Sequence, residues 1–493
     1  MIRLLQTHCV FVVVLVLGLL IMAARPVTDP DLWWHLRTGE LILQTRAIPH
    51  SDPFSFTRNG APWIDHEWLP QIAMFLIYRA TGWAGLIVTF AIVIAAAFVV
   101  VYLRSPGRPY VAGAIAAWGA VASIPSWGVR PQMLTLLLAS ILLLILENSL
   151  DRPRLIWWIP PLILLWVNLH AGFALGLALI ALFCAGEILD RTLGEGPNSK
   201  SRLAQLGSVL LLSIALVPLN PYGTKLYLYP FQTLHSRTMQ VYIGEWFSPN
   251  FHDPKYLPTL LMMLAILIVP VLSPRRMRPR ELLLLLATTF LALRSVRHIP
   301  IYMLVAVPLM SGMVSSRLKS TRALTLLQPS DPPLPLAKSV FNAAVLASVL
   351  AFCVVRLGYV IGRQATTEAT AFPVAAVAFL EKDHPPEPIM NHYNWGGYFI
   401  WKLYPQNKVY IDGRADVYGD AFMDEFAYAY YLKGRSWPTA LNHWNIETVV
   451  LPPDAPLITA LSGSSGWKTL FRDEQAVVLS KEPKMARESP IHP

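Results

Sequence analysis

The sequence carries little charge and almost no cysteine. Only 14% of its 493 residues are charged, against about 25% in an ordinary soluble protein, and three are cysteine. So few cysteines exclude a disulfide scaffold. We find no glycine-rich phosphate loop, no zinc-ligand spacing and no nucleic-acid-binding module, so no nucleic-acid partner is expected. Apolar residues make up 54% of the chain and its mean hydropathy is +0.46. This composition excludes a disordered chain and indicates a polytopic membrane protein.

Long apolar runs predict the membrane spans. A span needs about 20 mainly apolar residues. Eleven segments qualify: 5–24, 84–103, 110–127, 131–147, 155–169, 171–189, 203–218, 257–273, 281–296, 299–315 and 339–361. The pair 155–169 and 171–189 is either two short spans or a re-entrant pair. The first span resembles a signal peptide, and we expect it to be retained as an anchor.

The loops between these spans alternate in character. One set is short and rich in arginine and lysine, as cytoplasmic loops are, and the N-terminus falls on that side. The opposite set contains the long segments 25–83, 219–256 and 366–493, which we expect to be extracytoplasmic. We therefore predict a transmembrane module over 1–365 and a small extracytoplasmic α/β domain over 366–493. Its expected strands are 408–411, 448–451 and 476–479, with helices over 373–382 and 421–432.

Polar side chains of unusual kinds collect in the outer segments. Ionisable residues close to the hydrocarbon layer are costly and usually mark function. The acidic candidates are Asp29, Asp31, Asp65 and Glu67, the cationic ones are Arg294, Arg297 and His298, and His35, His66, Arg130, His170 and Glu245 accompany them. Structural roles compete with these: Asp29 could cap a helix over 31–45, and the two arginines of span nine could pair with lipid phosphate.

This set of side chains suits transfer from a lipid-linked phosphate donor. A carboxylate, Asp29 or Asp31, would act as general base on an acceptor hydroxyl. Arg297, supported by Arg294 and His298, would stabilise charge on the departing phosphate. The four first-loop carboxylates could also hold Mg²⁺ or Mn²⁺, although their spacing does not require a metal.

The layout of the chain resembles the GT-C class of integral-membrane glycosyltransferases, which use polyprenyl-phosphate or polyprenyl-pyrophosphate sugars. Asp29-Pro30-Asp31 stands where that class places its catalytic acid in the first outer loop, which implies the base role. Segments 393–398 and 409–416 resemble the tail of the oligosaccharyltransferase catalytic subunit, whose Trp-Trp-Asp-Tyr-Gly motif helps to bind acceptor. The resemblance implies substrate contacts for Trp395, Asp412, Arg414 and Asp416.

Two features qualify that resemblance. Gly396 stands where the motif has an acid, so the sequence does not predict N-glycosylation of proteins. Asp412-Gly413 is also a strong turn signal, and Arg414 with Asp416 could form a local salt bridge.

We therefore expect a membrane glycosyltransferase in the bacterial inner membrane; the bacterial source follows from the resemblance only. It would transfer a sugar from a polyprenyl-phosphate donor to a glycan, lipid or protein acceptor on the outer side. The alternatives are a lipid-linked glycan polymerase or ligase, a transporter and a non-catalytic scaffold. A transporter should show two-fold sequence symmetry and polar residues near the middle of the membrane. Arg356 and Glu187 are isolated there.

Overall fold

The chain folds into two compact units. The computed structural model describes residues 5–194, 200–319, 321, 334–434 and 437–482. The bundle unit lies within Met1–Val27, His66–His235 and Gln240–Gln364, and the tail unit lies within Thr28–Asp65, Ser236–Met239 and Ala365–Pro493. The tail unit thus combines the C-terminal segment with residues 28–65, which follow the first span.

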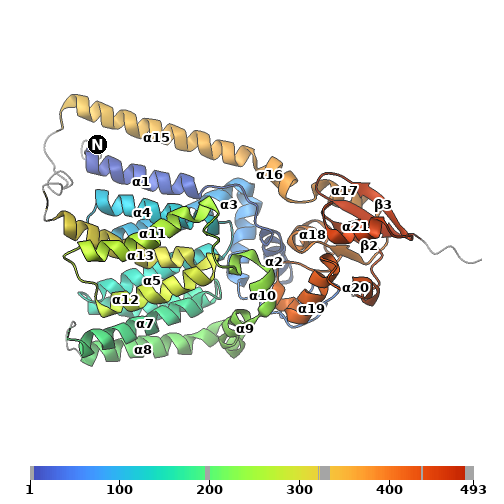
Figure 1. The fold of residues 1–493 in the computed structure, drawn as a ribbon, viewed down its shortest axis with the longest axis horizontal. Coiled ribbons are helices and arrows are strands. Elements are labelled where there is room, and N and C mark those ends of the chain that lie inside the picture. Colours follow the sequence, from blue (N-terminus) through green and yellow to red (C-terminus); the bar gives the residue numbers. More distant parts are fainter. Residues whose placement is uncertain (1–4, 195–199, 320, 322–333, 435–436, 483–493) are drawn as a thin grey trace, which may run out of the picture. The chain divides into compact units, whose positions relative to one another are not determined.

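Helices make up the bundle unit (Figure 1). Its α-helices are α1 (Thr7–Ala23), α3 (Trp68–Arg104), α4 (Tyr110–Ser123), α5 (Gln132–Asn148), α6 (Ile159–Val167), α7 (Phe173–Thr192), α8 (Lys200–Leu216), α9 (Tyr229–His235), α11 (Leu257–Leu272), α12 (Pro279–Arg294), α13 (Ile299–Leu318) and α15 (Leu336–Gly362). Short 3-10 segments join them: η2 (Ile124–Ser126), η3 (Pro153–Trp158), η4 (Val217–Leu219), η5 (Gly223–Tyr227), η6 (Gly244–Trp246), η7 (Pro254–Tyr256) and η8 (Val296–His298). Helix α10 (Arg237–Tyr242) begins in the tail unit.

Each of the eleven predicted spans coincides with a helix in the described part of the chain. Six segments are long and apolar enough to cross a membrane: Trp68–Arg104, Phe173–Thr192, Ser201–Leu219, Pro254–Leu272, Val296–Leu318 and Leu336–Gly362. Four further apolar helices are shorter: Thr7–Ala23, Tyr110–Ser126, Gln132–Asn148 and Pro153–Val167. The uncertain pair forms two helices, α6 and α7. The protein is a multi-pass membrane protein.

Helix α3 is longer than a bilayer requires. Its 37 residues would extend about 55 Å at 1.5 Å per residue, against a hydrocarbon core of about 30 Å. Gly82 interrupts the helix with φ 61° and ψ −150°, a conformation that glycine adopts without steric cost. The kink separates the start of α3, where the sequence predicts an outer loop, from the span predicted over 84–103.

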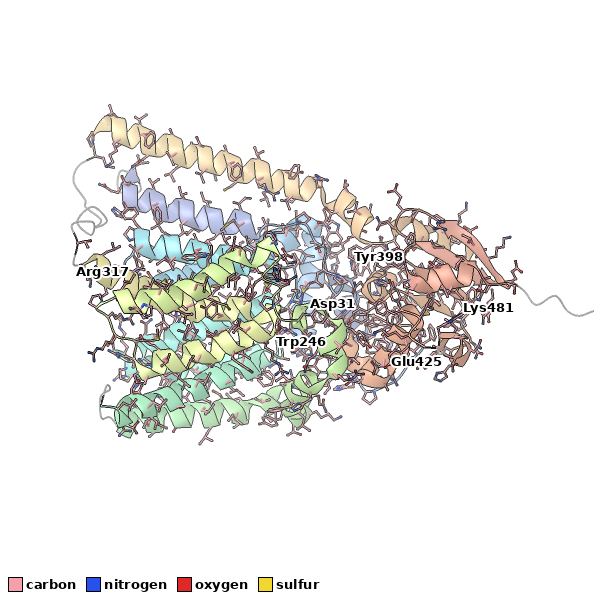
Figure 2. All side chains as sticks on the ribbon, in the orientation of Figure 1. Asp31, Trp246, Arg317, Tyr398, Glu425 and Lys481 are labelled. Atoms are coloured by element: carbon pink, nitrogen blue, oxygen red, sulfur yellow. The ribbon has the colours of Figure 1, made fainter. Side chains whose placement is uncertain are left out.

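The helices of the bundle alternate in direction, so their turns gather at two ends. Arg317, near the end of α13, marks one end, and Trp246 lies at the other (Figure 2). We call the first the basic end, because the turns at 104–108, 152–154 and 275–280 are rich in arginine. The second, which carries His66, Arg130, His170 and Glu245, is the site end.

Charges inside the bundle are paired. At the basic end, Glu187 of α7 binds Arg280 Nη1 at 3.0 Å and Arg202 Nε at 3.5 Å, and all three residues are buried. The expectation that Glu187 is isolated is wrong, because α8 and α12 bring arginines to it from sequence positions that no local pattern relates. Such pairing is how ionisable residues are accommodated among apolar helices.

A four-stranded mixed sheet lies in the tail unit. Its order is β1 (Ile389–Asn391), β2 (Thr448–Leu451), β4 (Val477–Lys481) and β3 (Trp467–Arg472), where β1 and β2 are parallel and the other pairs antiparallel. The accompanying helices are α2 (Leu32–Thr45), α16 (Gln364–Ala371), α17 (Val374–Asp383), α18 (Gly396–Leu403), α19 (Ala415–Tyr430), α20 (Trp437–His443) and α21 (Pro456–Ser462), with the 3-10 turn η9 (Tyr393–Trp395). This sheet confirms the strands predicted near 448–451 and 476–479.

The third predicted strand, 408–411, is wrong. Val409 makes only an isolated parallel bridge to Ser55 among the described residues, with Val409 N donating to Phe54 O and Phe56 N to Val409 O, each at 3.0 Å. The β-branched run is extended, but its partner is a short piece of the segment that follows the first span and not the sheet.

A buried arginine joins that loop to the C-terminal segment. Arg414 is 2% exposed and lies between Asp412 (Nη2 to Oδ2, 2.6 Å) and Asp52 (Nη1 to Oδ1, 2.8 Å). Tyr418 donates its hydroxyl to Asp412 Oδ2 at 2.6 Å, and the guanidinium lies 4.7 Å from the centre of the Trp63 ring. Burial alone would lower the pKa of Arg414, but the two carboxylates raise it well above its ordinary value. The arginine therefore stays charged and pairs with both carboxylates.

We expect Asp52→Asn to destabilise the tail unit by about 1.5–3 kcal/mol, because it removes one of the two charge-assisted contacts of Arg414 and leaves Asp412 as the other. Thermal unfolding of the purified protein in detergent, followed by near-ultraviolet circular dichroism, measures the change. Glu447→Gln is the matched control, since Glu447 pairs with Lys481 at 3.2 Å on the surface and should contribute at most about 1 kcal/mol. Equal shifts for the two variants would contradict a structural role for the buried arginine.

Candidate functional site

A cluster of cations around one carboxylate lies at the site end of the bundle. Glu245, in η6, binds Arg130 and also lies 3.4 Å from Arg297 Nη1. Arg297 stacks over Trp246, with 4.5 Å between its Cζ and the ring centre. Burial alone would raise the pKa of Glu245, but the charges of Arg130, Arg297 and His298 outweigh burial and hold it below its ordinary value. The carboxylate is therefore ionised between two guanidinium groups.

Two hydrogen bonds, one from a serine hydroxyl and one from a backbone amide, hold this cluster in place. Ser295 Oγ donates to Glu245 O at 2.8 Å, and Val296 N donates to Phe247 O at 3.0 Å. They attach η6, which lies in the segment 219–256, to η8 at the start of α13. Arg294 is exposed and donates to Gln240 Oε1 at 3.2 Å. The structure thus brings Arg130, Glu245, Arg297 and His298 together, although they come from three segments.

Three other predicted residues form a second cluster in the bundle unit. His66 and Glu67 precede α3, and His170 precedes α7. Glu67 Oε1 lies 3.3 Å from His170 Nε2 and 3.7 Å from His66 Nε2. Their potential ligand atoms all lie within 4.8 Å of one another, a spacing that a metal ion could use. Whether a metal ion could bind here depends on the hydrogen bonds that His170 makes.

The second nitrogen of His170 accepts hydrogen bonds. The Gly172 amide, which can only donate, lies 2.8 Å from His170 Nδ1. The Thr135 hydroxyl lies 3.0 Å from the same atom and itself accepts from Trp166 Nε1 at 3.0 Å. Nδ1 is therefore the unprotonated nitrogen, and Nε2 carries the proton that faces Glu67. A metal needs the lone pair of Nε2, so these residues do not fit a metal held through His170, and we derive no step through one.

Thr135 and Trp166 are residues that sequence reasoning missed. Both are buried in apolar helices, α5 and α6, where they read as core residues. The sequence feature that could have pointed to Thr135 is a threonine within the apolar run 131–147. Thr135 lies in the first turn of α5 and Arg130 lies two residues before that helix, so this short stretch contributes to both clusters.

The tail unit contains the remaining predicted residues. Asp29 Oδ1 accepts the Asp31 amide at 2.9 Å, and Asp31 Oδ1 accepts Trp34 Nε1 at 3.2 Å. Asp29 therefore holds the turn before α2, while Asp31 is the residue at its N-terminus. A Cβ added to Gly413 would lie 1.7 Å from Asp31 Oδ1. The carboxylate of the first-loop motif thus lies directly against the Asp412-Gly413 turn.

The glycines of the tail motif also allow close packing. A Cβ on Gly397 would lie 2.4 Å from Pro30 O, and one on Gly396 would lie 2.1 Å from Ile411 O. The acid that the oligosaccharyltransferase motif carries has no room at Gly396. Trp395 is buried beside His392, with 5.2 Å between ring centres.

The other tail-unit candidates differ in exposure. His35 and Asp65 are buried, and the His35 ring lies 3.8 Å from that of Trp34. Asp416 is exposed in the first turn of α19. Asp412 and Arg414 belong to the buried ion pairs described above, so we propose that they fold the unit and do not contact substrate.

No protein-family model matches the sequence, and no curated protein matches it. Several solved structures match this chain. The oligosaccharyltransferase of Archaeoglobus fulgidus in the apo form matches with a TM-score of 0.52 and 13% identity, covering 90% of this chain and 69% of that chain. AglB from the same organism, in complex with an inhibitory peptide and a dolichol-phosphate, gives 0.53 and 13%, covering 89% and 69%. ArnT from Cupriavidus metallidurans, bound to undecaprenyl phosphate, gives 0.47 and 14%, covering 97% and 98%.

The chain has the GT-C fold. The match spans both units and confirms the predicted fold class. Identities of 13% show the fold and not the substrate, so the roles of individual residues are proposals.

His392 makes the tail unit sensitive to acid. Burial lowers its pKa from 6.5 to about 4, and Nδ1 has no hydrogen-bond partner among the described residues. The unfolded chain therefore takes up a proton first, near pH 6.5. Stability is complete above pH 6.5 and is lost progressively as the pH falls toward 4.

We expect His392→Gln to flatten the pH dependence of the tail unit's melting temperature between pH 6.5 and 4, a window worth on the order of 3 kcal/mol. Near-ultraviolet circular dichroism across that range measures it. His443→Gln, which removes an exposed histidine, is the control and should change the slope less than His392→Gln does. Parallel slopes for wild type and His392→Gln would show that this histidine does not titrate with folding.

Proposed function

We propose that the protein is a membrane glycosyltransferase. It takes a sugar from a polyprenyl-phosphate-linked donor and transfers it to a glycan, lipid or protein acceptor. The observation that carries the proposal is the GT-C fold over 90% of the chain. AglB was solved with a dolichol-phosphate and ArnT with undecaprenyl phosphate, both of which are polyprenyl-type phosphates.

The proposed location is the inner membrane of a bacterium, with the N-terminus cytoplasmic and the tail unit outside. The arginine-rich turns support this orientation, because such turns stay on the cytoplasmic side. The site end of the bundle then faces the extracytoplasmic side, where a lipid-linked sugar would be used.

The proposed base is Asp31, or Asp29 beside it. Asp31 Oδ1 already accepts a hydrogen bond from Trp34, and Asp29 accepts one from the Asp31 amide. These contacts hold the carboxylates in place without neutralising them. A base so positioned would remove the proton of the acceptor hydroxyl as that oxygen attacks the sugar.

The proposed donor-phosphate site is the cluster of Arg130 and Arg297. Two guanidinium groups can stabilise the negative charge that develops on the departing lipid phosphate. Glu245 now lies between them and carries the same sign of charge as the phosphate. Glu245 would therefore compete with the donor for both arginines, and binding would require the arginines to exchange one anion for the other.

We expect one of the two single variants, Asp31→Asn or Asp29→Asn, and the double variant to lower sugar transfer by roughly 10²–10⁴-fold, the usual contribution of a general base. Asparagine keeps the size and one acceptor oxygen of the carboxylate, so folding should be preserved. Membranes containing the protein are assayed with a panel of radiolabelled undecaprenyl-phosphate sugars and lipid extract as acceptor.

Asp383→Asn, at an exposed position of α17, is the control for loss of one carboxylate. Full activity in the double variant Asp29→Asn/Asp31→Asn would remove these acids from the mechanism.

We expect Arg297→Ala and Glu245→Gln to change lipid-phosphate binding in opposite directions. Loss of a charge-assisted contact costs about 1.5–3 kcal/mol, so Arg297→Ala should weaken binding of undecaprenyl phosphate roughly ten- to hundredfold. Glu245→Gln removes the competing charge at constant size and should tighten it. Microscale thermophoresis in detergent measures both, with Arg154→Ala as the control for loss of a basic-end arginine. Weakening by both variants would show that Glu245 only holds the cluster together.

A further inference from the structure

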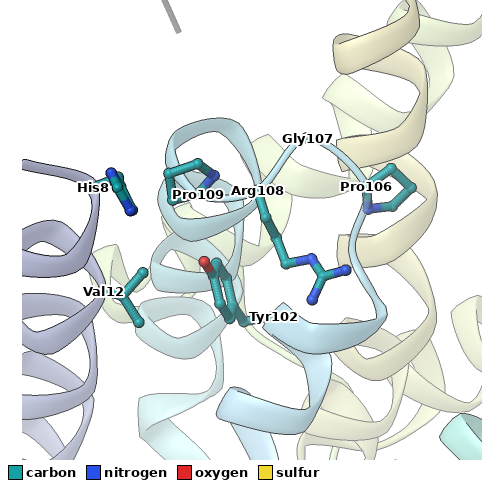
Figure 3. A pocket seen from close by; sticks show the side chains of 7 residues that line it. All are labelled: His8, Val12, Tyr102, Pro106, Gly107, Arg108 and Pro109. Atoms are coloured by element: carbon teal, nitrogen blue, oxygen red, sulfur yellow. The ribbon is translucent and has the colours of Figure 1, made fainter. Parts of the chain in front are cut away.

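A cavity lies at the basic end of the bundle, opposite the candidate site. Its volume is about 500 Å³, and its lining comes from α1 and from the end of α3 with the turn to α4 (Figure 3). The lining residues are His8, Val12, Tyr102, Pro106, Gly107, Arg108 and Pro109. Since α3 starts at Trp68 and ends at Arg104, this cavity is a full membrane thickness away from Glu67.

The turn that forms one wall is fixed in place. Ser311 Oγ of α13 donates to Pro106 O at 2.5 Å, and the Ala112 amide donates to Gly107 O at 3.3 Å. Gly107 has φ +81°, and a Cβ there would lie 1.9 Å from Ser315 Oγ, so only glycine allows this approach to α13. The wall is therefore held before any ligand binds.

The lining has cationic and hydrogen-bonding groups but no acid. Arg108 is exposed and has no ion pair in the described part of the chain, and His8 faces the same cavity from α1. Arg104, four residues earlier, is different: its Nε and Nη2 bind both oxygens of Glu147 at 2.9 and 2.7 Å. The arginine that reaches the cavity is thus the one left without a carboxylate, while its neighbour is neutralised.

An anion with hydrogen-bond-accepting oxygens fits this lining. Arginine binds phosphate through parallel N–H donors, and histidine and the Tyr102 hydroxyl can add donors to the remaining oxygens. Phosphate groups are abundant at this depth, because lipid headgroups surround the ends of membrane helices. We propose that this cavity is a binding site for a phosphate group, carried by a lipid headgroup of the surrounding leaflet or by a soluble phosphate.

Native mass spectrometry of the detergent-purified protein tests the proposal. The probes are dioleoylphosphatidic acid and dioleoylglycerol, which differ only by the phosphate. The Arg297→Ala background is used throughout, so that binding at the site end of the bundle does not contribute, and the result stands apart from the proposed glycosyl transfer. We expect adducts of phosphatidic acid and none of diacylglycerol, with at least a fivefold loss in Arg108→Gln.

Arg276→Gln is the matched control, because Arg276 is an exposed arginine in another turn of the basic end. It should bind phosphatidic acid as the background does, and Arg108→Lys should recover part of the binding. Displacement of the lipid by millimolar inorganic phosphate would mean that the site binds a soluble phosphate. No displacement would mean that the site binds the phosphate of a lipid headgroup. Equal loss in Arg108→Gln and Arg276→Gln, or equal binding of the two lipids, would overturn the proposal.

Discussion

A single guanidinium group determines how the tail unit is built. Arg414 lies between two carboxylates, one near it in sequence and one in the loop that follows the first span. Removing three charges from water is costly, and the cost is recovered only if each charge has its partner. If the loop took another position, Asp52 would lose Arg414, and Arg414 would keep only Asp412 as its partner. The proposed base lies on the same loop, so the position of Asp31 against Gly413 depends on that ion pair.

In the bundle unit, too, charges removed from water lie beside partners of opposite charge. Glu187, Arg280 and Arg202 compensate one another at the basic end, and Arg130, Glu245 and Arg297 do so at the site end. The two sets differ in exposure. The first is buried, whereas the side chains of the second are 19–28% exposed. Only the second can exchange a protein carboxylate for an outside anion, which is why it is the proposed phosphate site.

Hydropathy was sufficient to predict the helices of the bundle, because a helix that crosses lipid must be apolar along most of its length. The predicted spans and the fold class follow from that requirement. Pairings between distant segments were beyond sequence reasoning. Nothing local relates Glu187 to Arg280, or Asp52 to Arg414, since each pairing is set by how whole elements pack. The run 408–411 is a case in which a local pattern was misleading. Its composition indicates a strand, but in the structure it pairs with a loop and not with the sheet.

The sequence was sufficient to predict which types of residue would form the candidate site, but not which of them would lie together. Acids, arginines and histidines in outer segments indicated where chemistry would lie, because charge near lipid is costly. His66, Glu67 and His170 nevertheless form a group whose proton arrangement depends on Thr135 and on the Gly172 amide. A threonine in an apolar helix and a backbone N–H have no distinctive sequence pattern, so the tautomer of His170 is visible only in the structure.

The composition of the tail unit has a consequence for biosynthesis. Thr57 donates to the carbonyl of Tyr410, a residue 353 positions later. At about 5–20 residues per second, a ribosome needs roughly 20–70 s to synthesise the intervening chain. During that interval the segment carrying Asp29 and Asp31 has emerged without its partners and must wait on the membrane surface. A nascent chain that terminates early would insert its helices and yet never assemble the surroundings of those two acids.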